Sequence, residues 1–170
     1  GKTTVAMNLA FALAHLEHKV LLIDADMRKP SVGKNCGLAP NAPGLSSLVA
    51  GTASEKDCIH KVEGLDVLPS GIIPPNPLEL LSSRRFTELL HRLGERYSRI
   101  VIDSAPVNEV SDALILATKA SAVVFVTKAD ATPYQVAHAA LRRLRSTNAP
   151  VIGVVLNLVD MAKLAEWDTY

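Results

Sequence analysis

The sequence contains few of the residues that mark disulfide-bonded or metal-binding proteins. It has only two cysteines in 170 residues, Cys36 and Cys58, and they do not share the spacing of metal ligands. The simplest interpretation is two reduced thiols in a cytosolic protein. The five histidines are scattered along the chain, which does not favour a histidine metal site.

Long apolar runs and an excess of charge of one sign are also absent. No stretch approaches the roughly 20 apolar residues that span a bilayer, so we expect neither a transmembrane helix nor a signal peptide within these residues. The 18 basic and 17 acidic residues leave a net charge of +1, which does not favour a nucleic-acid partner. What is present is 48% hydrophobic residues and a mean hydropathy of +0.20, typical of a compact globular domain.

Short apolar runs alternate with helical patterns along the chain. The runs are continuous and mostly rich in β-branched residues, like strands that are buried on both faces of a parallel sheet. We predict strands at residues 20–23, 65–68, 100–102, 122–126 and 151–156. The spacing of apolar residues predicts helices at residues 4–16, 78–96, 111–120 and 134–146, with short helices near 45–49 and 54–60. This alternation predicts a single α/β domain over residues 1–170, with a mostly parallel sheet and helices on both faces.

The first four residues, GKTT, match the second half of a phosphate-binding loop, G-x-x-x-x-G-K-[ST]. Backbone N–H groups at the start of the helix that follows would bind phosphate. Lys2 would add a positive charge, and Thr3 would offer its hydroxyl to Mg²⁺. We therefore predict that Gly1, Lys2, Thr3 and Thr4 contact a nucleotide, although a glycine-capped helix start would explain the same residues.

Two acids follow the first predicted strand, in the segment VLLIDADMRKP at residues 20–30. In open parallel sheets, ligands bind beyond the carboxyl ends of the strands. Asp24 and Asp26 would repel each other unless a cation lies between them, and Arg28 or Mg²⁺ could supply that charge. We predict that both acids belong to a metal site and that Arg28 lies beside the bound ligand. A polar loop after a strand is the alternative.

The segment RIVIDSAPV at residues 99–107 repeats the pattern, with Asp103 at the end of a buried strand. This is the Walker B pattern, whose carboxylate holds Mg²⁺ directly or through water. A phosphate loop followed by two acid-ended strands is the order found in P-loop NTPases. Asn157 ends the last predicted strand, and its amide suits an adenine edge, although an Asn in a turn fits the spacing equally well.

These segments, together with GLSSLVAG and PSGIIPPNPLELLSSRRF, resemble the bacterial tyrosine kinases (BY-kinases), the P-loop autokinases of exopolysaccharide and capsule export. The resemblance covers residues 1 to about 159, and the broader kin are the MinD/ParA-type ATPases. It implies a MinD/ParA-like P-loop fold with ATP and Mg²⁺ as cofactors. It also implies a set of roles: Lys2, Asp24, Asp26 and Asp103 in catalysis; Thr3, Asp24, Asp26 and Asp103 as metal ligands; Asn157 against adenine.

The resemblance further implies partners and a location. A membrane chain-length-determinant (Wzz-type) region, fused upstream or separate, would hold the domain at the inner face of the bacterial plasma membrane. The domain would associate with itself and phosphorylate tyrosine-containing proteins, and so control polysaccharide chain length and export. The tyrosine-rich tail common in the family is not evident, because only Tyr170 lies near the end; Tyr97 is expected to be structural and Tyr134 to begin a helix.

The first glycine of the phosphate loop and the strand before it are expected to precede Gly1. We expect that strand to lie centrally in the sheet, beside the strands that end in Asp24 and Asp103. Without it, residues 1–170 would expose apolar surface and unpaired strand edges, so we expect them to be poorly soluble alone and to bind ATP weakly.

Two other functions stay open on the sequence. One is a MinD/ParA-type ATPase that works as a nucleotide-switched dimer. The other is a non-catalytic module that binds ATP only to stabilise an assembly. The segments DMRKP and PPNPLELL argue against the first of these.

Overall fold

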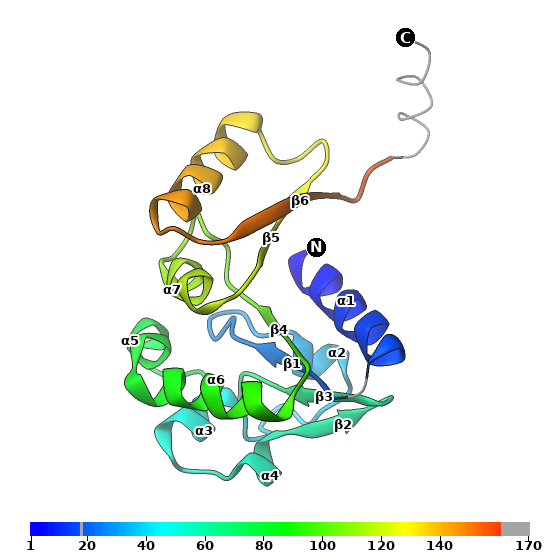
Figure 1. Cartoon of the computed structure of the whole chain (residues 1–170), viewed down its shortest axis with the longest axis vertical. Helices are drawn as coiled ribbons and strands as arrows, with labels where there is room; N and C mark the ends of the chain where they lie inside the picture. The colour runs from blue at the N-terminus through cyan, green and yellow to red at the C-terminus, as the bar shows by residue number, and fades with distance from the viewer. Residues whose placement is uncertain (18, 161–170) are drawn as a thin grey trace.

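The computed structural model describes residues 1–17 and 19–160 of the chain (Figure 1). In chain order the elements are α1 (Lys2–Leu16), β1 (Val20–Asp24), α2 (Val32–Asn35), α3 (Leu45–Ala50), α4 (Glu55–Cys58), β2 (His60–Val62), β3 (Leu65–Leu68), α5 (Pro77–Ser82), α6 (Arg84–Arg96), β4 (Arg99–Asp103), α7 (Asp112–Lys119), β5 (Val123–Lys128), α8 (Tyr134–Ser146) and β6 (Val151–Asn157). All five predicted strands are present, and the predicted α/β class is confirmed.

The larger sheet has four strands in the order β2-β3-β1-β4. Strand β1 is parallel to both of its neighbours, whereas β2 is antiparallel to β3. The register of β1 and β4 sets Asp24 opposite Asp103 at the carboxyl edge of the sheet. The two acids that the sequence predicts for one site are therefore neighbours across a strand pair.

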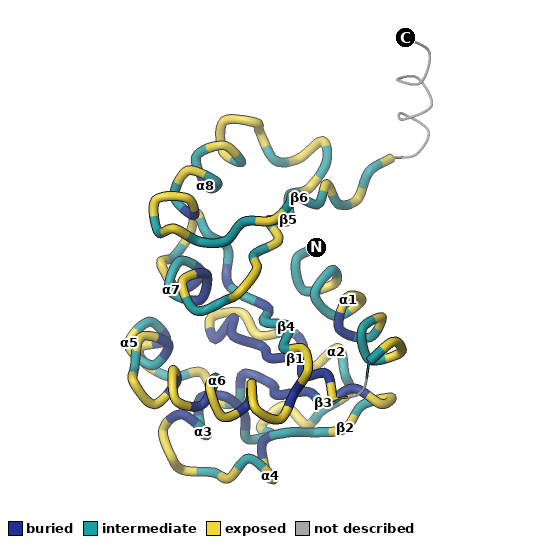
Figure 2. Tube along the Cα trace, in the orientation of Figure 1, coloured by how far each residue is buried: buried dark blue, intermediate teal, exposed yellow. Residues whose placement is uncertain are grey.

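Strand β1 is buried along its whole length, as Figure 2 shows, because helices cover both faces of the sheet. Leu21 and Ile23 belong to a core formed with α3, α5, α6 and α7. Val20 and Leu22 alternate with them and belong to a second core formed with α1 and α2. This arrangement confirms the predicted helices on both faces of the sheet.

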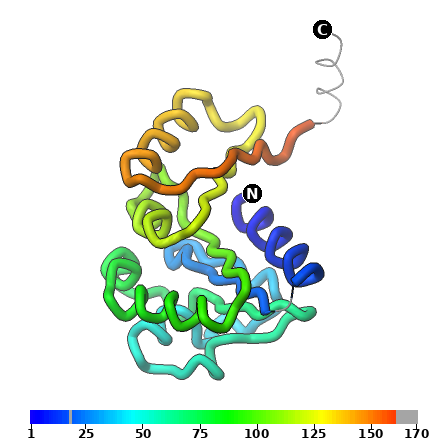
Figure 3. The backbone as a smooth tube through the Cα atoms, viewed as in Figure 1, coloured from blue at the N-terminus to red at the C-terminus, as the bar shows by residue number. Residues whose placement is uncertain are grey.

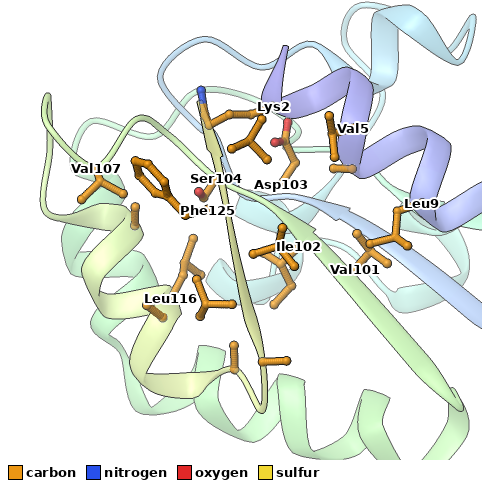
Figure 4. A pocket seen from close by; sticks show the side chains of 18 of the residues that line it. Lys2, Val5, Leu9, Val101, Ile102, Asp103, Ser104, Val107, Leu116 and Phe125 are labelled. Atoms are coloured by element: carbon orange, nitrogen blue, oxygen red, sulfur yellow. The ribbon is translucent and has the colours of Figure 1, made fainter. Parts of the chain in front are cut away.

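Strands β5 and β6 pair in parallel as a second sheet and do not extend the first one. The single sheet that the strand pattern predicts is therefore divided in two within the described residues. A cleft of about 1050 Å³ lies between β4 and β5, and α1 and α7 contribute to its walls. Figure 4 looks into this cleft, in which Ile102 of β4 and Phe125 of β5 are among the apolar lining residues.

This topology corrects the position expected for a strand before Gly1. Strand β1, which ends in Asp24, is flanked by β3 and β4, so it has no edge left for another partner. Among the described strands, β4 and β5 are the ones with an edge that faces the cleft. A strand ahead of Gly1 stays a prediction, but it could pair with the strand that ends in Asp103 and not with the one that ends in Asp24.

Three local features differ from the predicted elements. The helix expected at 78–96 is divided at Ser83, whose extended backbone ends α5 and whose side chain accepts a hydrogen bond from Phe86 N at the start of α6. Helix α2 and strand β2 were not predicted because each is only one turn or three residues long and carries no clear apolar period.

Across the described ranges, none of the helices is long and apolar enough to cross a lipid bilayer.

Candidate active site

Helix α1 begins at Lys2, directly after Gly1. The N–H groups of its first turn have no partner inside the helix, and they lie at the positive end of a 15-residue helix dipole. The first turn carries no acidic side chain that would neutralise this end. The start of α1 therefore has the properties of an anion site, as the GKTT segment predicts.

Thr3 joins this helix start to the end of β4. Its hydroxyl donates a hydrogen bond of 2.6 Å to Oδ2 of Asp103, and Ser31 Oγ donates to Thr3 Oγ1 at 3.2 Å. Burial raises the pKa of Asp103, while the bond from Thr3 and the charge of Lys2 act in the opposite direction. The structure thus brings together the lysine, the hydroxyl and the carboxylate that the sequence assigns to Mg-nucleotide binding.

Asp24 is completely buried at the end of β1. Its Oδ1 accepts a hydrogen bond from Asp26 N at 3.2 Å, and its Oδ2 accepts from Ser31 N at 3.1 Å and Val32 N at 3.0 Å. Burial raises the pKa of Asp24 to about 6, and the neighbouring charge of Asp103 adds to the rise, although the three backbone hydrogen bonds oppose it. Both oxygens of Asp24 therefore organise the turn that follows β1.

Asp26 closes the next part of the same turn. Its Oδ1 accepts hydrogen bonds from Arg28 N at 3.3 Å and Lys29 N at 3.0 Å. The side chain is nearly buried, and its charge raises the pKa of Asp103, so the two carboxylates lie in one electrostatic neighbourhood. Asp26 is therefore held by the backbone of the residues that follow it.

Arg28 has a partner that the sequence did not indicate. Its Nε donates to Asp112 Oδ2 at 2.8 Å and its Nη2 donates to Asp112 Oδ1 at 3.1 Å, which makes a bidentate ion pair with the first residue of α7. The predicted contact of Arg28 with the nucleotide stays a prediction. Asp112 and Ser31 are site residues that the sequence analysis did not assign, and the only local signal for either was an acid or hydroxyl at a helix start.

Asn157, at the end of β6, lies against the start of α1, and Figure 3 shows these two chain segments approaching each other. Its Nδ2 donates to Gly1 O at 3.4 Å. A Cβ atom at Gly1 would lie 2.4 Å from that nitrogen, so a larger residue there would displace the Asn157 amide. The structure places Asn157 beside the phosphate loop, and its contact with adenine stays a prediction.

A magnesium ion would need ligands beyond the protein. Among residues 1–17 and 19–160, no group of three or more His, Cys, Asp or Glu side chains is arranged to hold a metal ion. Mg²⁺ usually keeps several waters and takes only one or two protein ligands besides phosphate oxygens. The hydroxyl of Thr3 and the carboxylate of Asp103 are oxygen donors of this kind, so they fit an ion that is bound together with a nucleotide.

The tyrosines lie as the sequence predicts where they can be seen. Tyr97 is 7% exposed, and its hydroxyl donates to Asp66 Oδ2 at 2.8 Å, which confirms a structural role. Tyr134 is 75% exposed and is the first residue of α8. Tyr170 lies outside the described residues.

The fold and the phosphate-loop geometry define the class of protein as a P-loop NTPase of the MinD/ParA-like type. The family described as an AAA domain matches residues 1–146. The chain is also similar to the Pyrococcus furiosus cell division ATPase MinD, with a TM-score of 0.74 and 25% identity over 92% of this chain and 66% of that one. This likeness concerns the fold.

Sequence and structure comparisons then identify the family. The chain is 37% identical to the tyrosine-protein kinase YwqD of Bacillus subtilis strain 168, over 100% of this chain and 72% of YwqD. It superposes on the kinase domain of VpsO with a TM-score of 0.89 and 42% identity, over 93% of this chain and 78% of that one. The chain therefore belongs to the family of bacterial tyrosine-protein kinases.

Some relatives are much longer than the chain. It is 38% identical to the putative tyrosine-protein kinase EpsB of Ralstonia solanacearum over 94% of this chain, but it spans only 22% of the length of EpsB. Family membership thus concerns the nucleotide-binding domain and not the remaining length of these relatives.

Proposed function

We propose that this domain is an ATP- and Mg²⁺-dependent protein-tyrosine kinase that phosphorylates tyrosines on its own oligomer and on partner proteins. The contact between Thr3 Oγ1 and Asp103 Oδ2 carries the proposal, because it joins the phosphate loop to the acid-ended strand in the arrangement that a Mg-nucleotide requires. The similarity to tyrosine-protein kinases supports the choice of tyrosine as the acceptor.

In this mechanism the chain works mainly by holding and neutralising charge. The N–H groups at the start of α1 and the ammonium of Lys2 would bind the β- and γ-phosphates. Thr3 and Asp103 would hold Mg²⁺, which supplies charge neutralisation on the phosphate oxygens when it is bound. The tyrosine oxygen would form a bond to the γ-phosphorus while the bond from that phosphorus to the β–γ bridging oxygen breaks, so that ADP leaves.

The proton of the tyrosine hydroxyl needs an acceptor, and Asp26 suits this role better than Asp24. Both oxygens of Asp24 accept backbone hydrogen bonds. Within the described residues, the hydrogen bonds to Asp26 are all made to Oδ1, which leaves Oδ2 to face an incoming hydroxyl. Asp24 would then keep the turn in place while Asp26 takes the proton.

The proposal extends to partners and location. A membrane-anchored chain-length-determinant region, fused or separate, would hold the domain at the cytoplasmic face of the membrane, where it would regulate exopolysaccharide or capsule export. A tyrosine must be exposed to enter the site of another molecule as a substrate. Tyr97 is too deeply buried for this, whereas the exposure of Tyr134 is compatible with it.

The test is phosphotransfer by the full-length parent protein with Mg-[γ-³²P]ATP. We expect label on tyrosine that disappears in Lys2→Met and persists in Lys34→Met, a matched control at an exposed lysine of α2. Free phosphate without labelled protein would contradict the kinase proposal and favour a MinD-type ATPase. ATP binding without either product would favour a non-catalytic module.

A further inference from the structure

The Arg28–Asp112 ion pair connects two segments that both lead to the candidate site. Arg28 lies in the turn after β1, and Asp112 is the first residue of α7, 84 positions later in the sequence. The two hydrogen bonds of the pair measure 2.8 and 3.1 Å. The side chain of Asp112 is 1% exposed, whereas that of Arg28 is 41% exposed, so the pair closes over a buried carboxylate.

A buried carboxylate requires partners, because an unpaired charge away from water is strongly destabilising. Asp112 accepts two hydrogen bonds from the planar guanidinium of Arg28, one from Nε and one from Nη2, a geometry that lysine cannot reproduce. Its place in the first turn of α7 adds the favourable field of the helix dipole. Asp112 is thus fixed to α7, and Arg28 is fixed to Asp112.

The backbone of Arg28 also holds the side chain of Asp26. The backbone N–H groups of Arg28 and Lys29 donate to Asp26 Oδ1, so a displacement of Arg28 would move the carboxylate of Asp26. The side chain of Arg28 therefore binds Asp112 of α7, while its backbone N–H binds the carboxylate of Asp26, the proposed proton acceptor.

The segment between Asp103 and Asp112 links the end of β4 to the Arg28–Asp112 pair. It begins at Asp103, which faces Asp24 across the β1–β4 pair, and it is held from α8 by Arg143, whose Nη1 donates to Val107 O at 2.7 Å. The chain connects Asp103 to Asp112, and hydrogen bonds connect Asp112 to Arg28 and Arg28 to Asp26. The charge of Asp26 in turn acts on Asp103.

We propose that Arg28 and Asp112 form a positioning pair that sets Asp26 relative to Asp103 for Mg-nucleotide binding and phosphotransfer. This inference rests on the proposed function. The pair would act through Asp26, without contact to the substrate. In this proposal Arg28 acts through Asp26, and its predicted direct contact with the nucleotide is the alternative that the experiment below distinguishes.

The experiment is a double-mutant cycle in the full-length parent with Arg28→Met, Asp112→Asn and the double variant. We expect each single variant to lower kcat about tenfold, with KM for ATP nearly unchanged, because supporting contacts of metal and reacting groups typically have this effect. The double variant is expected to match the singles, since both changes break one interaction. Arg84→Met is the matched control, because Arg84 makes an exposed ion pair with Glu88 at the start of α6.

ATP affinity, measured with Mg²⁺ and with EDTA, supplies a second readout that does not depend on kinase activity. We expect Mg²⁺ to raise the ATP affinity of the pair variants about fivefold less than it raises that of the wild type. In EDTA the variants and the wild type should bind ATP equally well. If the wild type transfers no phosphate, the proposed function fails while this binding readout still tests the pair. Thermal unfolding of each variant, with assays run well below its Tm, separates loss of position from loss of fold.

Three outcomes would overturn the positioning pair. A raised KM in Arg28→Met alone would mean that Arg28 contacts the nucleotide directly. Additive effects of the two changes would mean that the residues act independently. A lower Tm with unchanged kcat and unchanged Mg²⁺ dependence would mean that the pair only stabilises the fold.

Discussion

The hydroxyl of Thr3 and the carboxylate of Asp103 are 100 residues apart in the sequence and 2.6 Å apart in the structure. This hydrogen bond links the first turn of α1 to the end of β4. Both groups are oxygen donors of the kind that Mg²⁺ prefers, so the bond marks the place where the proposed phosphate loop and the proposed metal ligand meet.

Thr3→Val tests this contact. The change removes the hydroxyl, keeps the shape of the side chain and leaves the buried carboxylate of Asp103 without that partner. We expect ATP affinity in Mg²⁺ to fall by about tenfold, and affinity in EDTA to change little. Thr118→Val is the matched control, because the Thr118 hydroxyl bonds only locally to Ile115 O on α7. Equal losses with and without Mg²⁺ would contradict a metal role for Thr3.

Asn157→Ala tests the predicted contact with adenine. Asn157 lies beside Gly1 at the end of β6, and its amide can pair with a base edge. We expect the change to weaken ATP binding about fivefold and to reduce the preference for ATP over GTP, as loss of one hydrogen bond would. Binding isotherms for both nucleotides provide the measurement, with Asn35→Ala as the control. An unchanged preference for ATP over GTP would mean that Asn157 only supports the structure of the phosphate loop.

Alkaline pH should destabilise the fold through Tyr97. Burial and the hydrogen bond to Asp66 raise the pKa of Tyr97 to about 12, against about 10 in the unfolded chain. The folded state favours the neutral phenol, so its contribution is complete below pH 10 and is lost as the pH rises toward 12. At pH 11 we expect Tyr97 to lower the free energy of unfolding by about 1.4 kcal/mol relative to pH 9.

Urea unfolding at pH 9 and pH 11 checks this expectation. Tyr97→Phe should remove that part of the pH dependence, and Tyr134→Phe should retain it, because Tyr134 is exposed. Identical pH dependence in the wild type and in Tyr97→Phe would show that other groups control alkaline stability.

The core beneath the sheet should depend strongly on Phe86. This side chain of α6 is completely buried and packs in the cluster that contains Leu21 and Ile23 of β1. Phe86→Ala should lower the free energy of unfolding by about 3–5 kcal/mol, because it removes a large apolar group and leaves a cavity. Leu16→Ala, at a side chain that is 82% exposed, should change it by less than about 0.5 kcal/mol. Chemical denaturation of both variants gives the comparison.

Several elements were predictable because their signals are local. The β-branched run at Val20–Asp24 predicts a buried strand, and the acid at its end predicts a site at the carboxyl edge. The apolar period of residues 84–96 predicts a helix, although the capping role of Ser83, which divides it from α5, was not evident. The residues GKTT, Asp24, Asp26 and Asp103 were assigned to one site because their order follows a known motif.

The sequence by itself determined the α/β class, every described strand except β2, and the acids at the strand ends, because each depends on periodicity within a few neighbouring residues. Only the tertiary structure decided that β5 and β6 form a separate sheet and that Arg28 pairs with Asp112. Both are choices among partners that are distant in the sequence, and no local period distinguishes one distant partner from another. For Thr3 and Asp103 the motif predicted a common site, and the tertiary structure added the hydrogen bond between them, because β4 ends and α1 begins at one edge of the sheet.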